Sequence, residues 1–172
     1  MMRILPVITI LAMAAVYYSC GGNKITVHEV KKEHRIMDEA DLLTSQQEDS
    51  IFTIIQDLEK NIGSQIAVLT VVSLNGEKIE ERSLQTAEKM GLGRAKYDDG
   101  ILVMVAVDDR QMRIEVGYGL EKIIKDEIAA RINREVMAPR FSKGDYFNGI
   151  KEGVEKIKNL IEENGHLVGE RP

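Results

Sequence analysis

The stretch GILVMVAVDDRQMRIEVGYG, residues 100–119, decides the architecture of the chain. It contains two strand-like runs, 100–107 and 112–119, joined by the polar tetrad DDRQ. Two such runs with a short polar link are typical of an antiparallel β-hairpin. Asp108 and Asp109 suit the turn, because short acidic side chains hydrogen-bond to nearby backbone and tolerate unusual dihedrals. We therefore interpret this second acidic pair as structural.

A further strand is predicted upstream of the hairpin, in the run QIAVLTVVSL, residues 65–74. Its continuous apolar, β-branched character is typical of a central strand that is buried on both faces. An amphipathic segment over residues 79–90, closed by Gly-Leu-Gly, separates this strand from the hairpin. The strand–helix–strand order predicts two parallel strands joined by a right-handed crossover.

Apolar residues recur at helical spacing in three other segments. The first runs from Ile51 to Ile62 before Gly63, and its capping box is either Thr44 with Gln47 or Ser45 with Glu48. The second runs from Leu120 to Val136 and is expected to end at Ala138-Pro139. The third is capped by Asp145 and ends at Asn164-Gly165. On this third helix Gly149 and Gly153 lie one turn apart and are expected to allow close packing on the sheet.

These elements predict an α/β fold, a three-layer α/β/α sandwich. Its small mixed sheet contains one βαβ crossover and one β-hairpin. The chain has 172 residues, which suits one domain, and a formal net charge of −5. It contains no Lys/Arg stripe of the kind that binds nucleic acid.

The N-terminal stretch MMRILPVITILAMAAVYYSCGGN resembles a bacterial lipoprotein signal. Its apolar run is shorter than the roughly 20 residues that a membrane-spanning helix needs, and Cys20 follows it directly. Tyr17 and Tyr18 depart from the usual lipobox, so an uncleaved anchor or an unmodified cysteine is the alternative. Lipidated Cys20 would hold the protein to a membrane, facing the periplasm, and Gly21 favours the outer membrane. The expected organisation is a signal peptide over 1–20, a flexible tether over 21–35, a domain over 36–164 and a tail over 165–172.

The ends of the hairpin strands gather acidic residues. Asp98 and Asp99 precede the first strand and Glu121 follows the second, so antiparallel pairing places all three at one edge of the sheet. Carboxylates this close repel one another unless they are protonated or bridged by a cation. A hard cation such as Ca²⁺ also takes backbone carbonyl oxygens, which Gly100, Gly117 and Gly119 could expose. The alternative is an ordinary turn at Asp98-Asp99 and a helix that opens at Glu121.

Other catalytic chemistry has little support in the sequence. His28, His34 and His166 lie in the terminal segments, so nucleophilic catalysis based on histidine is not expected. Arg94 and Lys96 precede the acidic pair and could face either a phosphate or water.

Four stretches resemble the TPM-domain family, which includes a phosphatase-like protein of the thylakoid lumen, a photosystem II repair protein and a receptor modulator. They are VLTVVSLNGEKIEE, GLGRAKYDDGILVMVAVDDRQMRIEVGYGLE, RINREVMAPRF and GDYFNGI, and the resemblance extends from about Ile36 to Leu160. It implies a compact α/β/α domain, secreted or membrane-anchored, in which some members bind Ca²⁺ or similar ions and some are acid phosphatases. The family pattern maps onto Asp98 with Gly100, and onto Gly117, Gly119, Leu120 and Glu121. It also maps an early Asp onto Asp38.

The resemblance leaves the function open between three hypotheses. The first is a lipid-anchored accessory module of the cell envelope that binds a divalent cation, Ca²⁺ first and Mg²⁺ second, and acts through a protein partner. Its metal ligands would be Asp98, Asp99, Gly100, Gly117, Glu121 and Asp38. The second is a metal-assisted acid phosphatase on phosphate monoesters, with Asp98 or Asp99 holding the catalytic ion. The third is a partner-binding domain in which the acids are only turns.

Overall fold

The structure is a computed structural model that describes residues 31–170. Cys20, the signal segment and most of the expected tether lie outside the described residues. Within residues 31–170 no helix is long and apolar enough to cross a membrane.

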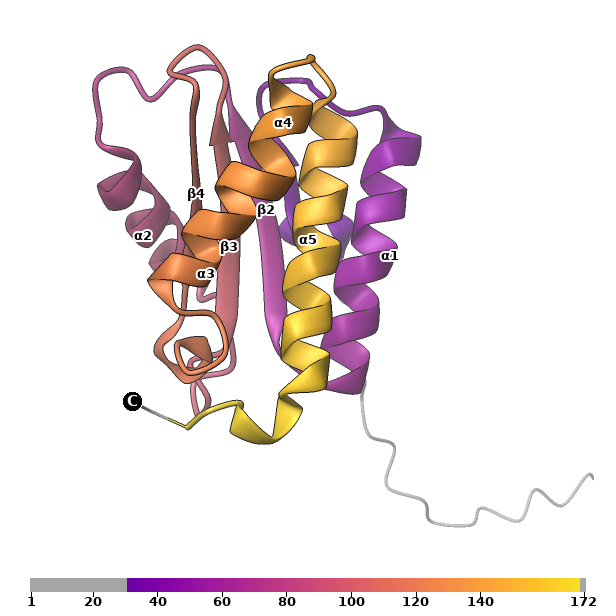
Figure 1. The fold of residues 1–172 in the computed structure, drawn as a ribbon, viewed down its shortest axis with the longest axis vertical. Helices are drawn as coiled ribbons and strands as arrows, with labels where there is room; N and C mark the ends of the chain where they lie inside the picture. The colour runs from indigo at the N-terminus through magenta and orange to yellow at the C-terminus, as the bar shows by residue number, and fades with distance from the viewer. Residues whose placement is uncertain (1–30, 171–172) are drawn as a thin grey trace, which may run out of the picture.

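One mixed sheet forms the centre of the domain, with strand order β1-β2-β3-β4. The strands are β1 (Ile36–Asp38), β2 (Gln65–Val71), β3 (Gly100–Ala106) and β4 (Gln111–Val116). The first three are parallel, and β4 returns antiparallel to β3 as the predicted hairpin. We call the end where β2 and β3 begin and β4 finishes the lower end, as it is drawn in Figure 1.

Helices cover both faces of the sheet, which confirms the predicted three layers (Figure 1). One face carries α1 (Ser45–Asn61), α5 (Tyr146–Glu163) and the continuous run from α3 (Asp126–Ile132) to α4 (Ala138–Phe141), while the other carries α2 (Ile79–Met90). Alternate strand residues separate two apolar cores. Val68 and Val103 belong to the larger core with α1 and α5, and Leu69 and Met104 belong to the smaller core under α2.

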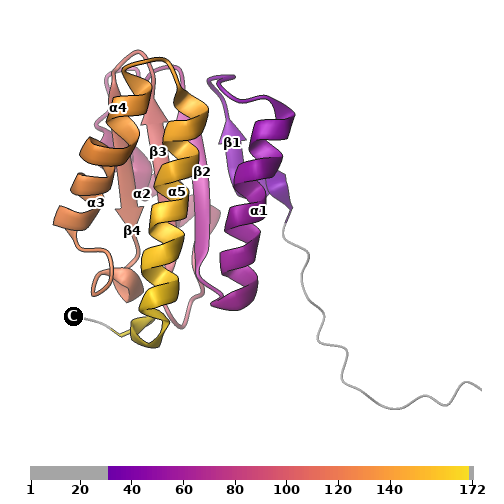
Figure 2. The ribbon, with the colours of Figure 1, turned by 45° about the vertical axis from the view of Figure 1, so that its right-hand side comes forward.

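The chain makes two βαβ crossovers where the sequence predicted one. The added strand, β1, pairs with β2 over three residues, and a segment this short shows no period that a sequence can reveal. The strand order runs in one direction from β1 to β3, yet α1 and α2 lie on opposite faces. The two crossovers therefore have opposite hands. The crossover through α2 is right-handed, as predicted, and the rarer left-handed one passes through α1 (Figures 1 and 2).

The N-terminal signals of two helices act as the sequence predicts. The Thr44 hydroxyl accepts from the Gln47 N–H, and the Gln47 side chain accepts from the Thr44 N–H, so Thr44–Gln47 is the capping box of α1. The Asp145 carboxylate accepts from the Asn148 N–H at the start of α5.

The predicted helix from Leu120 to Val136 needs correction at both ends. Leu120 closes a short 3-10 turn, Tyr118–Leu120, and α3 starts only at Asp126. At the other end, a π-helical turn over Asn133–Met137 leads directly into α4, so Pro139 does not stop the helical run. Pro139 is accommodated because it directly follows the π-helical turn, where the regular bonding pattern already changes.

Two further expectations are revised by the packing. Gly149 and Gly153 contact Phe141 and Met137, so they allow α5 to approach the π-helical turn and α4 and not the sheet. The expected tail also packs on the domain: Leu167 and Val168 contact the larger core, and the Gly169 N–H donates to the Gly119 carbonyl at 2.9 Å.

Candidate functional site

The lower end of the sheet gathers four of the predicted site residues around one cavity. Asp98, Gly100, Gly117 and Glu121 line a space of about 360 Å³ between α2 and the end of β4. Antiparallel pairing is the reason, since the Gly117 N–H donates to the Gly100 carbonyl at 2.8 Å. Asp98 has a φ of 50°, a left-handed conformation that Asp tolerates better than most residues.

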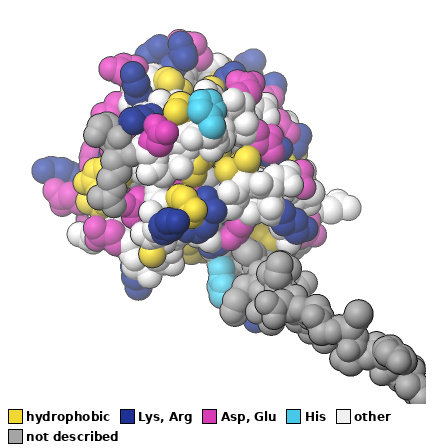
Figure 3. Space-filling model, turned by 90° about the horizontal axis from the view of Figure 1, so that it is seen from below, with side chains coloured by type: hydrophobic (Ala, Val, Ile, Leu, Met, Phe, Trp, Pro, Cys, Tyr) yellow, Lys and Arg dark blue, Asp and Glu magenta, His cyan; other side chains and the backbone are white. Residues whose placement is uncertain are grey.

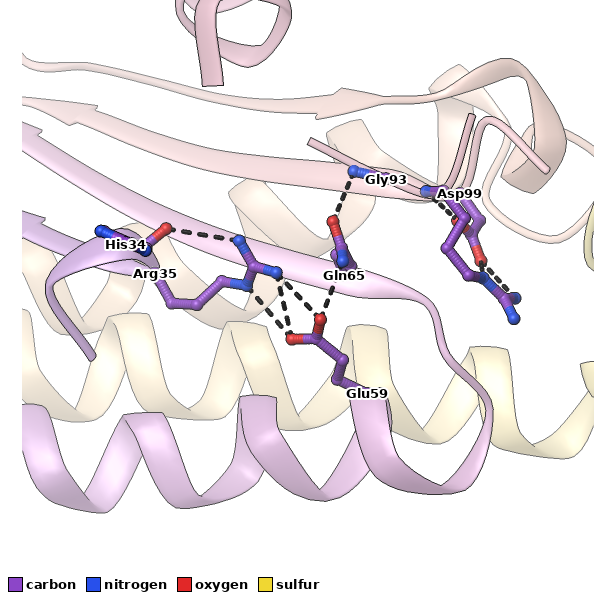
Figure 4. Close-up of polar contacts among 7 residues, drawn as sticks. His34, Arg35, Glu59, Gln65, Gly93 and Asp99 are labelled. Atoms are coloured by element: carbon purple, nitrogen blue, oxygen red, sulfur yellow. Dashed lines mark hydrogen bonds and ion pairs between the residues drawn. The ribbon is translucent and has the colours of Figure 1, made fainter. Parts of the chain in front are cut away.

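Asp99 lies apart from that cavity, fully buried in the loop before β3. One carboxylate oxygen accepts from the Arg94 backbone N–H at 2.8 Å. The other accepts from the Arg94 guanidinium at 2.8 and 2.5 Å (Figure 4). It also accepts from the Ser64 hydroxyl at 3.2 Å. A buried carboxylate with this set of donors is already neutralised. Its position is that of a structural anchor for the loop.

Arg94, one of the two candidate phosphate-facing residues, is held by the same contacts. Its guanidinium also lies 4.1 Å from the centre of the Tyr97 ring, a cation–π arrangement. Gly63 supports this placement, because a Cβ there would overlap the guanidinium. Lys96, the other candidate, lies exposed, 5.3 Å from the centre of the same ring.

A second polar network ties this loop to the sheet and to α1. The Gln65 side chain accepts from the Gly93 N–H at 2.8 Å and donates to Glu59 at 2.8 Å (Figure 4). Glu59 in turn receives the Arg35 guanidinium at 2.9 Å. Arg35 belongs to the expected tether, so the packed part of the chain begins before residue 36.

The glycines at the lower end allow backbone segments to approach closely. A Cβ at Gly119 would overlap the Tyr97 carbonyl, and one at Gly117 would overlap the Asp98 carbonyl. The Asp98 carbonyl also accepts from the Gly119 N–H at 3.0 Å. These residues are therefore needed for the fold of the lower end, whether or not an ion binds there.

Asp38 lies at the upper end of the sheet, away from the other predicted ligands. Its carboxylate accepts from the Thr70 hydroxyl and from the Leu43 N–H, the latter at 2.7 Å. Asp109, in the hairpin turn at the same end, accepts from the Leu74 N–H at 2.7 Å. The expectation that Asp38 joins Asp98 and Glu121 is corrected by this topology: β1 enters the sheet in parallel, so its end lies opposite theirs.

The described residues contain no group of three or more His, Cys, Asp or Glu side chains arranged to hold a metal ion. The structure brings together Asp98 and Glu121 but not Asp99 or Asp38. Glu88 and Glu115 line the same cavity and were missed. They come from α2 and β4, so only the packing of these two elements reveals them.

Apolar side chains also reach the surface at this cavity. Leu84 and Tyr118 line it and are 49% and 66% exposed. Seen from below, the lower end shows hydrophobic side chains among acidic and basic ones (Figure 3). The sequence indicated that Tyr118 is exposed, because it lies between two glycines in a turn, where an aromatic side chain has few apolar neighbours to pack against. A mixed apolar and acidic surface suits contact with another molecule.

A larger cavity, about 520 Å³, lies at the upper end between the hairpin turn and α4. Phe141 and Tyr146 line it with Arg110, and none of the predicted site residues does. Its lining brings no pair of carboxylates together, so the lower end is the better candidate site.

Fold and site together define a small α/β/α domain with an acidic cavity at one sheet end. The TPM-domain family model matches residues 36–160, and the chain belongs to that family. A solution structure of an N-terminal domain from P. gingivalis is 30% identical, with 76% of this chain and 83% of that chain covered at a TM-score of 0.71. The BA42 protein of Bizionia argentinensis is 24% identical, and the match covers 70% of this chain and 82% of that chain at a TM-score of 0.61. A likeness at this identity supports the fold alone. No functionally curated protein matches the chain.

Proposed function

We propose that this chain is a TPM domain held in the bacterial cell envelope by lipid on Cys20. It binds a divalent cation at the lower cavity and acts through a protein partner. The observation that supports the cation site is the shared lining of one cavity by Asp98 and Glu121 with the backbone of Gly100 and Gly117. The exposed Leu84 and Tyr118 beside it support a partner.

The donor set suits a partly hydrated ion. Two carboxylates and a few backbone carbonyls leave several of the six to eight positions of Ca²⁺ to water. We therefore expect weak binding, with a dissociation constant of about 10⁻⁴ to 10⁻³ M, as in extracellular calcium modules. Mg²⁺ is the second choice because it keeps several of its waters. Glu88 adds negative charge without needing to touch the ion, whereas the charge of Glu115 is balanced by Arg113 at 2.6 Å.

Calcium titration of a fragment that starts at Thr26 tests the site, since that fragment contains every described element. We expect amide NMR shifts concentrated at residues 98–100 and 117–121. Asp98→Asn should weaken binding by about tenfold, because affinity follows the charge of the ligand set. Asp108→Asn makes the same change at the opposite end of the sheet and should leave binding unchanged. A titration without shifts at the lower end would contradict the cation site.

Metal-assisted phosphatase activity on phosphate monoesters is the alternative that the family resemblance supports. It would use the same cavity, but Arg94 is committed to Asp99 and to the Tyr97 ring. The test is hydrolysis of a chromogenic phosphate at acidic pH. Activity that is lost in Asp98→Asn and kept in Asp108→Asn would favour the phosphatase over the accessory module.

The lipid anchor is tested separately on the full chain in bacterial cells. Cys20→Ser should abolish incorporation of labelled fatty acid and move the protein from the membrane to the soluble envelope fraction. Two or three acyl chains hold a protein firmly, at about 0.8 kcal/mol for each buried methylene. A Cys20→Ser protein that still carries label and still sediments with membranes would overturn the lipobox assignment.

A further inference from the structure

Strand β4 forms a free edge of the sheet. It pairs with β3 and with no other strand of the described chain. The bond from the Gly117 N–H to the Gly100 carbonyl fixes the alternation along the pair. Gln111, Arg113 and Glu115 therefore direct their backbone groups towards β3. Met112, Ile114 and Val116 direct theirs away from the sheet, and such a row of unpaired groups can accept another strand.

A groove follows this edge. Its volume is about 430 Å³, and it is lined by β4 from Met112 to Val116 between the first turn of α2 and the α3 helix. Ala129 and Ala130 form part of the α3 side, and these small side chains leave room for an extended chain beside β4. The groove continues towards the lower cavity, because both are lined by Glu115, Val116 and Glu121.

The groove has a strong excess of negative charge. Its acidic residues are Glu80, Glu115, Glu121 and Asp126, against the single basic residue Arg113. Arg113 is itself bonded to Glu115 at 2.6 Å, and this hydrogen bond raises the pKa of its guanidinium above the usual range. Pairing of two copies through β4 would bring two such acidic edges together. Charge therefore disfavours a second copy and favours a basic occupant.

Asn133 also lies at this groove. Its Oδ1 is the only buried side-chain polar atom without a hydrogen-bond partner among residues 31–170. It lines the groove and opens the π-helical turn of Asn133–Met137. A buried acceptor without a donor is costly, and π-helical turns are frequent at functional sites.

We propose that β4 accepts an extended, Lys-rich or Arg-rich segment of a partner protein as an added strand. Backbone groups of Met112, Ile114 and Val116 would pair with the segment, and the acids along the groove would bind its basic side chains. The proposal deepens the partner component of the proposed function and does not depend on a bound cation.

The test uses the full chain in a non-ionic detergent with a chelator present, so that it is independent of the cation titration. The probe is a short fluorescent peptide of alternating lysine and valine with blocked ends, followed by anisotropy. We expect binding that a peptide of alternating glutamate and valine does not show. Two N-methylated peptides are compared, one methylated at the odd-numbered residues and one at the even-numbered residues. Only one of the two should lose binding, because the backbone N–H groups of only one edge of the peptide face β4.

Two protein variants locate the site. Val116→Pro removes one outward N–H while leaving the bonds to β3 in place, and proline is tolerated in an edge strand in this way. We expect Val116→Pro to lower the affinity for the peptide at least about fivefold, in line with the loss of a strand hydrogen bond. The double variant Glu80→Gln with Asp126→Asn keeps the backbone intact and should lower the affinity for the peptide by about tenfold. Glu162→Gln with Glu163→Gln on α5 makes the same change of charge elsewhere and is the control.

Three results would overturn the proposal. The first is equal binding of the lysine and glutamate peptides. The second is equal loss in the groove pair and in the α5 control pair, which would mean nonspecific attraction. The third is a dimer in sedimentation that Val116→Pro dissociates, which would assign the edge to a second copy of the chain.

Discussion

The two acids at the start of β3 have different surroundings although they are adjacent and chemically identical. Asp98 lines the lower cavity, whereas Asp99 is buried with Arg94 and Ser64. The sequence could not decide which of the two faces inwards, because a left-handed residue at Asp98 changes the direction of the chain just before the strand. A possible signal was Arg94, an opposite charge at the far end of the same short loop.

The first prediction concerns stability at Asp99. Asp99→Asn removes the charge that neutralises the Arg94 guanidinium and should lower the free energy of unfolding by about 2–4 kcal/mol. Urea unfolding followed by circular dichroism measures the change. Asp98→Asn is the matched control, and we expect a loss of about 1 kcal/mol or less, because Asn tolerates the same left-handed backbone. Equal losses in both variants would contradict the structural role of Asp99.

At the scale of elements, α5 packs closely against the helical run of residues 126–141 through two glycines. A Cβ at Gly149 would overlap the ring of Phe141, while one at Gly153 would meet the flexible thioether of Met137. Overpacking against a ring costs about 1–3 kcal/mol. Replacing a helical glycine with alanine gains about 1 kcal/mol in propensity. We therefore expect Gly149→Ala to destabilise the protein and Gly153→Ala to be close to neutral in thermal unfolding.

Two outcomes bear on that second prediction. Gly149→Ala combined with Phe141→Leu should recover part of the loss, because the smaller side chain makes room for the methyl group. A destabilisation at Gly153→Ala as large as that at Gly149→Ala would mean that Met137 cannot move, and the predicted difference would be wrong.

The sequence predicted correctly those helices and strands whose local pattern agrees with their role in the fold. The hairpin, β2, α1 and α5 have strong patterns and clear end signals, and all are present, as is α2, whose period is weaker. β1 escaped prediction because three residues form a strand only through their neighbour. The π-helical turn escaped because Ile128, Ile132 and Val136 have the same spacing in an α-helix. Pro139 suggested an end, although the helical run continues from the π-helical turn through it into α4.

At the scale of the whole molecule, the last described residues close the lower end. Leu167 and Val168 pack against the larger core, and Gly169 bonds to Gly119. Glu170 also pairs with Lys122 at 3.3 Å, although an exposed pair of this kind contributes little. The segment was expected to be a tail, because its eight residues, GHLVGERP, show no sustained period.

Truncation after Asn164 is the third prediction. Loss of the apolar contacts should lower the free energy of unfolding by about 1–3 kcal/mol. Amide shifts should appear at Tyr97 and Gly119, which the segment contacts. Truncation after Gly169, which keeps these contacts, serves as the control. An unchanged stability in the shorter fragment would show that the segment only rests on the surface.

The described chain begins beside β1, and the free strand β4 lies across the sheet from it. With strands about 4.8 Å apart, the two edges are separated by roughly 14 Å. If Cys20 is embedded in a bilayer, the eleven residue steps from it to Lys31 reach at most about 40 Å when fully extended. The anchored domain then samples only a shallow layer next to the membrane. A partner segment must therefore come close to the membrane to reach β4. It binds at the edge of the sheet opposite β1, where the linker to the lipid enters the domain.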